Sequence, residues 1–260
     1  MGASIQISRE MNRAETTVSR NRRAGYELML VVLFTGLLAW LMSWMLDTET
    51  MPIKHVRIEG KFVHLSPDML QQRIKGNVKG GFFNIDVTAV RDKLLAEPWV
   101  HDVSVHRVWP DSLQVFVNEQ IAVAIWNETG LLNKRGEFFS PEKSTFPTGL
   151  PVITGPEGHY QQMMEKYYFL QSLFTPFSMH INHLIQDERR AWTIQLDSGL
   201  KILLGRRNFE TRIKRFTALI PEYFGDKLGN VDSIDMRYPN GFAVKWQSGI
   251  TSIHDGNGAL

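Results

Sequence analysis

Residues Leu28–Leu46 read LMLVVLFTGLLAWLMSWML, nineteen positions without a charged side chain. As a helix that rises about 1.5 Å per residue, this segment spans roughly 28 Å, close to the hydrocarbon thickness of a bilayer. A membrane-spanning helix needs apolar side chains all round, because lipid supplies no polar partners. The segment therefore predicts a transmembrane helix, with the rest of the chain tethered to a membrane.

The charges on either side of this segment predict its orientation. The first 25 residues contain five arginines and two glutamates, whereas the far side begins with Asp47 and Glu49. By the positive-inside rule, residues 1–27 form a cytoplasmic tail and the remainder lies in a periplasm-like space. Two alternatives remain open. One is a cleaved signal peptide, although no A-x-A cleavage pattern follows the segment, and the other is a soluble core helix.

Composition excludes several kinds of function. The part of the chain after residue 46 carries 24 basic and 24 acidic residues, which argues against a nucleic-acid partner. The chain has no cysteine, which excludes a thiol nucleophile, a disulfide framework and a Cys-ligated metal. A region of this size can bury an adequate core without disulfides.

Residues 51–121 show the order strand, helix, helix, strand, strand. Ser66 followed by Pro67 is typical of a helix start, and Asp86 opens a second helix in the same way. Alternating apolar residues predict two strands after the helices, up to Glu119. Two helices packed on one face of a three-stranded sheet is the compact arrangement expected for this order.

Residues 122–250 change to many short strands. Alternating residues on either side of Asp197-Ser198-Gly199 predict a β-hairpin, and a helix is predicted over about 159–173. A second helix is predicted with Asn208 as its N-terminal cap and with Pro221 and Gly225 at its end. Asn240-Gly241 predicts a final hairpin turn. The fold class is therefore α+β, with one transmembrane helix, a small β-α-α-β-β domain, a β-rich domain with helices on a mixed or antiparallel sheet, and a C-terminal tail over 251–260.

The sequence shows few signs of catalysis. His180 and His183 are three positions apart, but they lie in a strand-like segment without a third metal ligand. Residues 140–143 match the S-x-x-K motif of penicillin-binding proteins, yet the partner motifs are absent and two prolines predict a loop. A pair of carboxylates for glycoside hydrolysis stays open, because such pairs need not be close in sequence. We expect no enzyme, metal, cofactor or small-molecule substrate.

The segment Arg107–Trp126, RVWPDSLQVFVNEQIAVAIW, resembles the end of the membrane-proximal domain in bacterial cell-division proteins of the FtsQ/DivIB family. Its W-P-x-x-L-x-V-x-V-x-E motif positions are Trp109, Pro110, Leu113, Val115, Val117 and Glu119. The C-terminal IDMRYPNGFAVKW, Ile234–Trp246, is similar to that family's DLRY-x-x-G-x-A-V-x-W ending. The resemblance covers nearly the whole chain, with departures at Ala122, Ile125 and Pro239-Asn240.

This resemblance implies a POTRA domain over 51–121, a β domain over 122–250, and a scaffold without catalytic activity. It implies a single-pass protein of the inner membrane, with periplasmic domains at the division septum. Proteins of the family bind the FtsB–FtsL pair and help assemble the septal peptidoglycan machinery. The resemblance also implies that the POTRA domain contacts other divisome proteins through its second helix and last strand.

The resemblance places the binding surface on a C-terminal edge strand, where unpaired N–H and C=O groups can accept a strand from a partner. The implied partner-binding residues are Arg190, Arg237, Tyr238, Asn240, Gly241, Phe242, Ala243 and Trp246. Arg190 would contact an acidic group of the partner. The alternative for single residues is a core position for Tyr238 or Trp246 and a solvated charge for Arg190.

Two other functions stay open. One is a POTRA-type chaperone or assembly factor, although such proteins usually carry several POTRA repeats. The other is a membrane-anchored periplasmic enzyme that acts on the cell wall.

Overall fold

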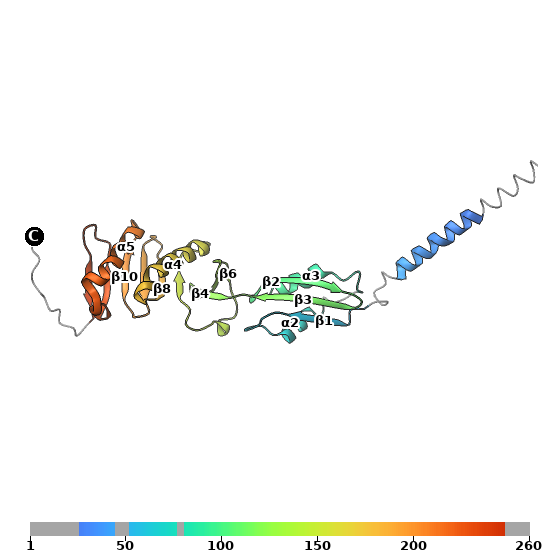
Figure 1. The fold of residues 1–260 in the computed structure, drawn as a ribbon, viewed down its shortest axis with the longest axis horizontal. Helices are drawn as coiled ribbons and strands as arrows, with labels where there is room; N and C mark the ends of the chain where they lie inside the picture. The colour runs from blue at the N-terminus through green and yellow to red at the C-terminus, as the bar shows by residue number, and fades with distance from the viewer. Residues whose placement is uncertain (1–25, 45–51, 77–80, 248–260) are drawn as a thin grey trace, which may run out of the picture. The chain divides into compact units, whose positions relative to one another are not determined.

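The computed structural model describes residues 26–44, 52–76 and 81–247. The charges that predict the orientation of the helix, and the predicted C-terminal tail over 251–260, lie outside the described residues. The chain divides into two compact units. The first comprises residues 1–61, 66–96 and 102–117, and the second comprises residues 62–65, 97–101 and 118–260. Figure 1 shows the helices and strands of the described residues.

The N-terminal helix covers Tyr26–Trp44 and is long and apolar enough to cross a membrane. It begins two residues before the predicted segment, and every side chain in it is exposed. A soluble core helix would bury one face, so this alternative does not fit. The Thr35 hydroxyl lies within hydrogen-bond distance of the carbonyl oxygens of Val31 (2.9 Å) and Val32 (3.0 Å), which satisfies its donor inside the helix.

The first unit has the predicted β-α-α-β-β order. Its elements are β1 (His55–Glu59), α2 (Pro67–Ile74), α3 (Val87–Leu95), β2 (Val100–Val108) and β3 (Ser112–Glu119), of which β2 and β3 extend into the second unit. The strand order is β1-β3-β2, with β1 parallel to β3. Because β3 lies in the middle of the sheet, a partner can reach it only through outward side chains and not by strand pairing.

The two helix starts are confirmed in detail. The Ser66 hydroxyl accepts a hydrogen bond from the Met69 N–H at 3.2 Å, and Pro67 occupies the first helical position. The Asp86 carboxylate accepts from the N–H groups of Thr88 and Ala89, both at 3.0 Å. These side chains satisfy N–H groups that a helix leaves unpaired at its start, so the local sequence fixes both boundaries.

The second unit contains a nine-stranded mixed sheet with the order β12-β11-β10-β9-β8-β7-β4-β5-β6. The elements are β4 (Ala122–Trp126), β5 (Gly130–Asn133), β6 (Phe138–Phe139), β7 (Val152–Thr154), α4 (Tyr160–Phe174), β8 (Ile181–Gln186), β9 (Trp192–Leu196), β10 (Lys201–Gly205), α5 (Phe209–Leu219), β11 (Val231–Asp235) and β12 (Ala243–Trp246). Strands β4, β7 and β8 run parallel, as do β10 and β11. The predicted β9–β10 hairpin is confirmed.

Helices α4 and α5 pack on this sheet, α4 against β8 and α5 against β10 (Figure 1). The rings of Phe174 and Phe216, both fully buried, meet edge to face at 6.2 Å and join the two helices. Trp126 of β4 is also fully buried. The core of the second unit therefore lies between its two helices and the sheet.

Three local predictions differ from the structure. Asn208 precedes α5, but its backbone is left-handed and its side chain makes no capping hydrogen bond. After Leu219 the chain continues in a π-helical turn, Ile220–Phe224, so Pro221 does not end the helical path. The predicted final hairpin is confirmed by the antiparallel pairing of β11 with β12, but its connection covers residues 236–242 and is longer than a tight turn at Asn240-Gly241.

Glu119, the last residue of the W-P motif, holds a turn of the chain within the second unit. Its carboxylate accepts hydrogen bonds from the N–H groups of Val63 and His64, both at 2.9 Å, and lies 2.8 Å from Nδ1 of the His64 ring. Burial opposes ionisation, but these donors outweigh it and hold the pKa of Glu119 below its usual value. The His64 ring stacks on Trp99 at 3.7 Å. Glu119 thus has a structural role.

Replacing Glu119 should destabilise the protein. In Glu119→Gln the amide cannot accept all these hydrogen bonds as a carboxylate does, so we expect a loss of about 1–3 kcal/mol in the free energy of unfolding at neutral pH. Denaturant unfolding of the full chain in detergent measures this. As a control, Glu165→Gln on the exposed face of α4 should change stability by less than about 0.5 kcal/mol.

The difference in the free energy of unfolding between wild type and Glu119→Gln should depend on pH. Because the folded-state pKa of Glu119 is lowered, its contribution is present above the ordinary pKa of the carboxyl and is lost as the pH falls through the folded-state pKa. The difference between wild type and Glu119→Gln should therefore shrink in acid. Equal stability of the two proteins at neutral pH would contradict the structural role.

Candidate partner-binding surface

Strand β12 forms one edge of the nine-stranded sheet. It pairs antiparallel with β11, with Ala243 opposite Asp235 and Trp246 opposite Val231. Within the described ranges, no strand pairs with its outer side. Backbone N–H and C=O groups on such an edge can pair with a strand from another chain. The geometry of the edge thus suits strand addition.

Exposure alternates along β12. Ala243 and Lys245 are exposed, whereas Val244 and Trp246 are half-buried and pack against the core together with Phe242. The Phe242 ring lies 5.7 Å from that of Phe224. Of the predicted site residues, Phe242 and Trp246 therefore also contribute to the fold, so their replacement would affect both binding and stability.

The connection between β11 and β12 carries five of the predicted residues: Arg237, Tyr238, Asn240, Gly241 and Phe242. Tyr238 is 55% exposed, so the alternative that it is a core residue is wrong. An exposed tyrosine beside an open strand edge offers a large, rigid contact area with a hydroxyl at its end. Tyr238 is therefore a candidate contact residue for a partner at this edge.

Arg215 of α5, which the sequence analysis did not identify, fixes the shape of this connection. Its guanidinium donates hydrogen bonds to four backbone carbonyl groups, those of Met236 (3.2 Å), Tyr238 (3.0 Å), Pro239 (2.8 Å) and Gly241 (3.1 Å). These contacts explain why Asn240-Gly241 does not form a tight turn, since the wider loop wraps around the guanidinium.

Arg212, one helical turn earlier in α5, supports the same region. It donates to the carbonyl oxygens of Leu204 (2.6 Å) and Arg237 (2.8 Å), and so ties the end of β10 to the start of the connection. Gly205 has φ +68°, and a Cβ there would lie 3.0 Å from the Arg212 guanidinium and 3.1 Å from the Arg237 side chain. Glycine lets both arginines approach the end of β10.

Arg237 is already paired within the chain. Its guanidinium donates to both carboxylate oxygens of Asp235, over 2.6–3.0 Å. These hydrogen bonds hold the pKa of Asp235 below its usual value, although partial burial opposes this. An acidic partner group would therefore share Arg237 with Asp235 instead of meeting a free charge.

Arg190 lies apart from the edge strand. It occupies the turn between β8 and β9, with φ +61°, and its N–H donates to the carbonyl oxygen of Asp187 at 2.8 Å. The turn shares one end of the sheet with the β11–β12 connection, but three strand spacings separate β9 from β12, about 15 Å at the usual spacing. Arg190 and the edge can contact one partner only if it extends along the strand ends.

Arg206 lies at the end of β10, between Arg190 and the edge strand in the order of the sheet. It is exposed just after β10 and lines a small hollow together with Arg190, Gln186 and Trp192. Arg190, Arg206 and Arg237 thus form a basic row along the ends of the strands. The residues of this row come from three separate segments, so only the fold reveals it.

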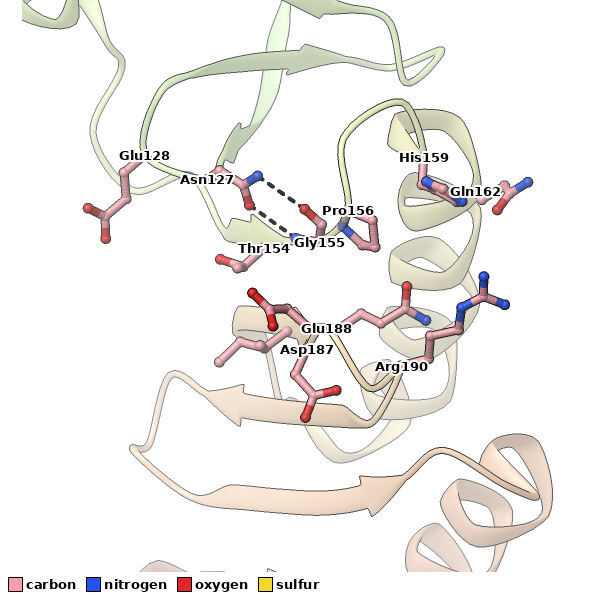
Figure 2. A pocket seen from close by; sticks show the side chains of 12 residues that line it. Asn127, Glu128, Thr154, Gly155, Pro156, His159, Gln162, Asp187, Glu188 and Arg190 are labelled. Atoms are coloured by element: carbon pink, nitrogen blue, oxygen red, sulfur yellow. Dashed lines mark hydrogen bonds between the residues drawn. The ribbon is translucent and has the colours of Figure 1, made fainter.

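A larger hollow of about 960 Å³ opens at the carboxyl ends of β4, β7 and β8 (Figure 2). The Asn127 side chain stabilises one wall of this hollow. Its amide donates a hydrogen bond to the Gly155 carbonyl (3.1 Å) and accepts one from the Gly155 N–H (3.0 Å). Arg190 lies at this hollow near Asp187 and Glu188. The lining mixes acidic, basic and amide groups, and the hydroxyl of its Thr154 lies 2.8 Å from the His183 ring.

The two histidines contact single neighbouring side chains, and the S-x-x-K segment does not begin an α-helix. His180 lies 3.4 Å from an Asp197 carboxylate oxygen, and the His183 ring contacts the Thr154 hydroxyl at 2.8 Å. Burial lowers the pKa of His183. Lys143 starts a short 3-10 turn, and no α-helix begins at Ser140. In the part of the chain that the structure describes, no group of three or more His, Asp or Glu side chains could hold a metal ion.

Comparison with known proteins gives a consistent result. The family model for the C-terminal part of cell division protein FtsQ/DivIB matches residues 124–237, and the model for the FtsQ-type POTRA domain matches residues 51–120. The first match ends one residue before Tyr238, so β12 lies beyond it.

Curated relatives match most of the chain. It is 32% identical over 239 residues to the cell division protein FtsQ of Coxiella burnetii, which covers 90% of this chain and 98% of that protein. It is 33% identical over 234 residues to FtsQ of Aliivibrio fischeri, covering 88% and 90%. FtsQ of Vibrio cholerae is 31% identical over 225 residues, covering 86% of each.

Removal of the Arg215 side chain should loosen the β11–β12 connection. In Arg215→Ala, four carbonyl groups lose their shared donor, so we expect faster tryptic cleavage after Arg237, measured by mass spectrometry of the fragment ending there. Lys214→Ala is the matched control, because it removes a neighbouring exposed positive charge from the same helix. Cleavage at the same rate in both variants would show that Arg215 does not hold the connection.

Proposed function

The chain belongs to the FtsQ/DivIB family of cell-division proteins, and we propose that it is a non-catalytic divisome scaffold that binds the FtsB–FtsL pair at the outer edge of β12. The observation that carries this proposal is the open edge of β12 beside the exposed Tyr238. A strand of the partner would pair with the backbone of β12 and extend the sheet by one strand.

Three features of the surface support binding of an acidic, extended partner. The backbone edge supplies hydrogen bonds, Tyr238 supplies an aromatic anchor, and the basic row of Arg190, Arg206 and Arg237 supplies charge. Tyrosine, tryptophan and arginine are the residue types that dominate binding energy at interfaces. In the proposed complex, Asn240 and Gly241 lie where the partner strand passes the loop, and Phe242 and Trp246 hold β12 against the core.

We further propose that the helix Tyr26–Trp44 anchors the protein in the inner membrane. The arginines that precede it and the acidic residues that follow it favour a cytoplasmic N-terminus and periplasmic POTRA and β domains. This orientation places β12 in the periplasm, on the same side as the periplasmic segments of FtsB and FtsL. Cell-division function accounts for a location at the septum.

The POTRA domain is proposed to contact other divisome proteins. Its last strand, β3, is the middle strand of the sheet, so contacts there would use side chains such as Phe116, which is 40% exposed. Its second helix, α3, begins at Val87 and offers its exposed face. Through these two surfaces the protein would link earlier and later division proteins and so control septal peptidoglycan assembly.

The sharpest test of the binding surface is Tyr238→Ala. Because Tyr238 is exposed and lies outside the buried core, this variant should keep its fold. It should bind the periplasmic part of an FtsB–FtsL complex at least about tenfold more weakly, about 1.4 kcal/mol. Calorimetry with the full chain in nanodiscs measures the dissociation constant. Tyr168→Ala, which removes an exposed tyrosine from α4, should bind like wild type. Unchanged affinity of a folded Tyr238→Ala protein would remove the proposed anchor.

The basic row should act on the rate of association. Charges at the rim of an interface steer the encounter, so Arg190→Ala and Arg206→Ala should each slow association with the FtsB–FtsL segment at low salt and change dissociation little. The difference from wild type should vanish as salt screens the charges. Stopped-flow measurements over a salt series check this, with Lys214→Ala as the control. A slower association that persists at high salt would point to lost contacts instead of lost steering.

A further inference from the structure

Two turns of the first unit lie next to residues 52–54. Lys54 donates its backbone N–H to the Asp111 carbonyl at 2.9 Å, and its ammonium lies 3.6 Å from the Asp111 carboxylate. Pro52 forms an antiparallel bridge with Gly81. The turn between β2 and β3 and the turn that begins at Gly81 are therefore both held next to the segment 52–54.

These two turns carry exposed apolar side chains. Trp109 is 72% exposed, and Val108 and Phe83 are 42% and 39% exposed. By contrast, Trp99, Trp126 and Trp192 in the rest of the folded chain are buried. An apolar cluster of this kind on a soluble surface marks contact with a membrane or with another protein. Tryptophan in particular favours the headgroup layer, where one side of the ring is apolar and its N–H stays hydrated.

The length of the chain keeps these turns close to the bilayer. Nine residues separate Trp44, the last described residue of the helix, from Lys54. Even when fully extended, they allow at most about 35 Å between the two Cα atoms. The turns are thus within reach of the membrane surface that the helix leaves.

Charge at these turns suits an anionic lipid surface. Lys54 and Arg107 are exposed, and the Arg107 guanidinium donates to the Ile85 carbonyl at 2.8 Å, which places a positive charge between the two turns. The carboxylate of Asp111 is paired with Lys54, which reduces its repulsion of phosphate groups. Basic residues near a spanning helix are attracted to anionic headgroups at the surface of the leaflet that they face.

We infer that Trp109, Val108 and Phe83 form a membrane-contact surface, with the two turns seated in the phospholipid headgroup layer and Lys54 and Arg107 against anionic headgroups. The inference rests on the proposed role of Tyr26–Trp44 as a membrane anchor. Its consequence is that the first unit would be held against the bilayer by its own side chains as well as by the covalent tether, which would restrict the orientations available to it.

The absence of cysteine from the chain allows a direct test with single labels. Full-length Val108→Cys and Phe83→Cys, each labelled with a fluorophore sensitive to polarity, are reconstituted into liposomes of phosphatidylethanolamine and phosphatidylglycerol. We expect blue-shifted emission and quenching by lipids that carry a spin label on the headgroup. Ser104→Cys is the matched control, because it is exposed on the same strand about 17 Å from Trp109, and it should show neither effect.

Two further variants make the outcomes distinct. Leu37→Cys, within the helix, should be quenched by lipids labelled deep in the acyl chain, and it reports on the anchor alone. Trp109→Ser combined with Val108→Cys should reduce quenching to the level of Ser104→Cys. Quenching at Leu37 without quenching at Val108 and Phe83 would overturn the membrane contact while leaving the anchor, and would assign the apolar cluster to a protein partner. No quenching at Leu37 would overturn the anchor and the inference with it.

Discussion

The hydrogen bonds from Arg215 to four carbonyl groups are the constraint on which the candidate binding surface depends. The connection 236–242 has no regular secondary structure, so its backbone acceptors need donors from elsewhere. One guanidinium supplies them, at the cost of leaving its buried Nε without a partner among the described residues. This anchor presents Tyr238 to solvent and sets where β12 begins. Arg212 adds a second tie from the same helix.

An open strand edge is useful for binding and hazardous for solubility, and β12 shows features of both. The strand is only four residues long, and it carries Lys245, whose ammonium lies 2.9 Å from the Asp232 carboxylate. Short edges and lysine side chains discourage pairing with arbitrary strands. In the proposed complex the basic row at the strand ends would add selectivity, because it would attract an acidic segment and repel a basic one. Together these features favour one kind of partner over general aggregation.

Much of the fold follows from local sequence patterns. The features that the sequence does not predict depend on contacts between residues far apart in the chain. Ser66 and Asp86 mark helix starts because a capping side chain acts within three residues, and the β9–β10 hairpin follows from alternation around one turn. The order of the nine strands joins segments far apart in sequence, so spacing does not reveal it. Asn240-Gly241 correctly predicted the β11–β12 hairpin, but not the length of its connection, which wraps around the distant Arg215 side chain. The resemblance grouped Arg190 with the edge residues, yet only the fold shows three strand spacings between them and Arg206 in the interval.

The central claim is that the partner pairs with the outer side of β12, and amide hydrogen exchange tests it most directly. The full chain in nanodiscs would be compared alone and saturated with the periplasmic part of FtsB–FtsL, with exchange followed across the whole chain. Strand addition predicts slower exchange in β12, Ala243–Trp246, on binding, because its outward N–H groups gain acceptors. Saturated binding with unchanged exchange in β12, and protection elsewhere in the chain, would contradict the account.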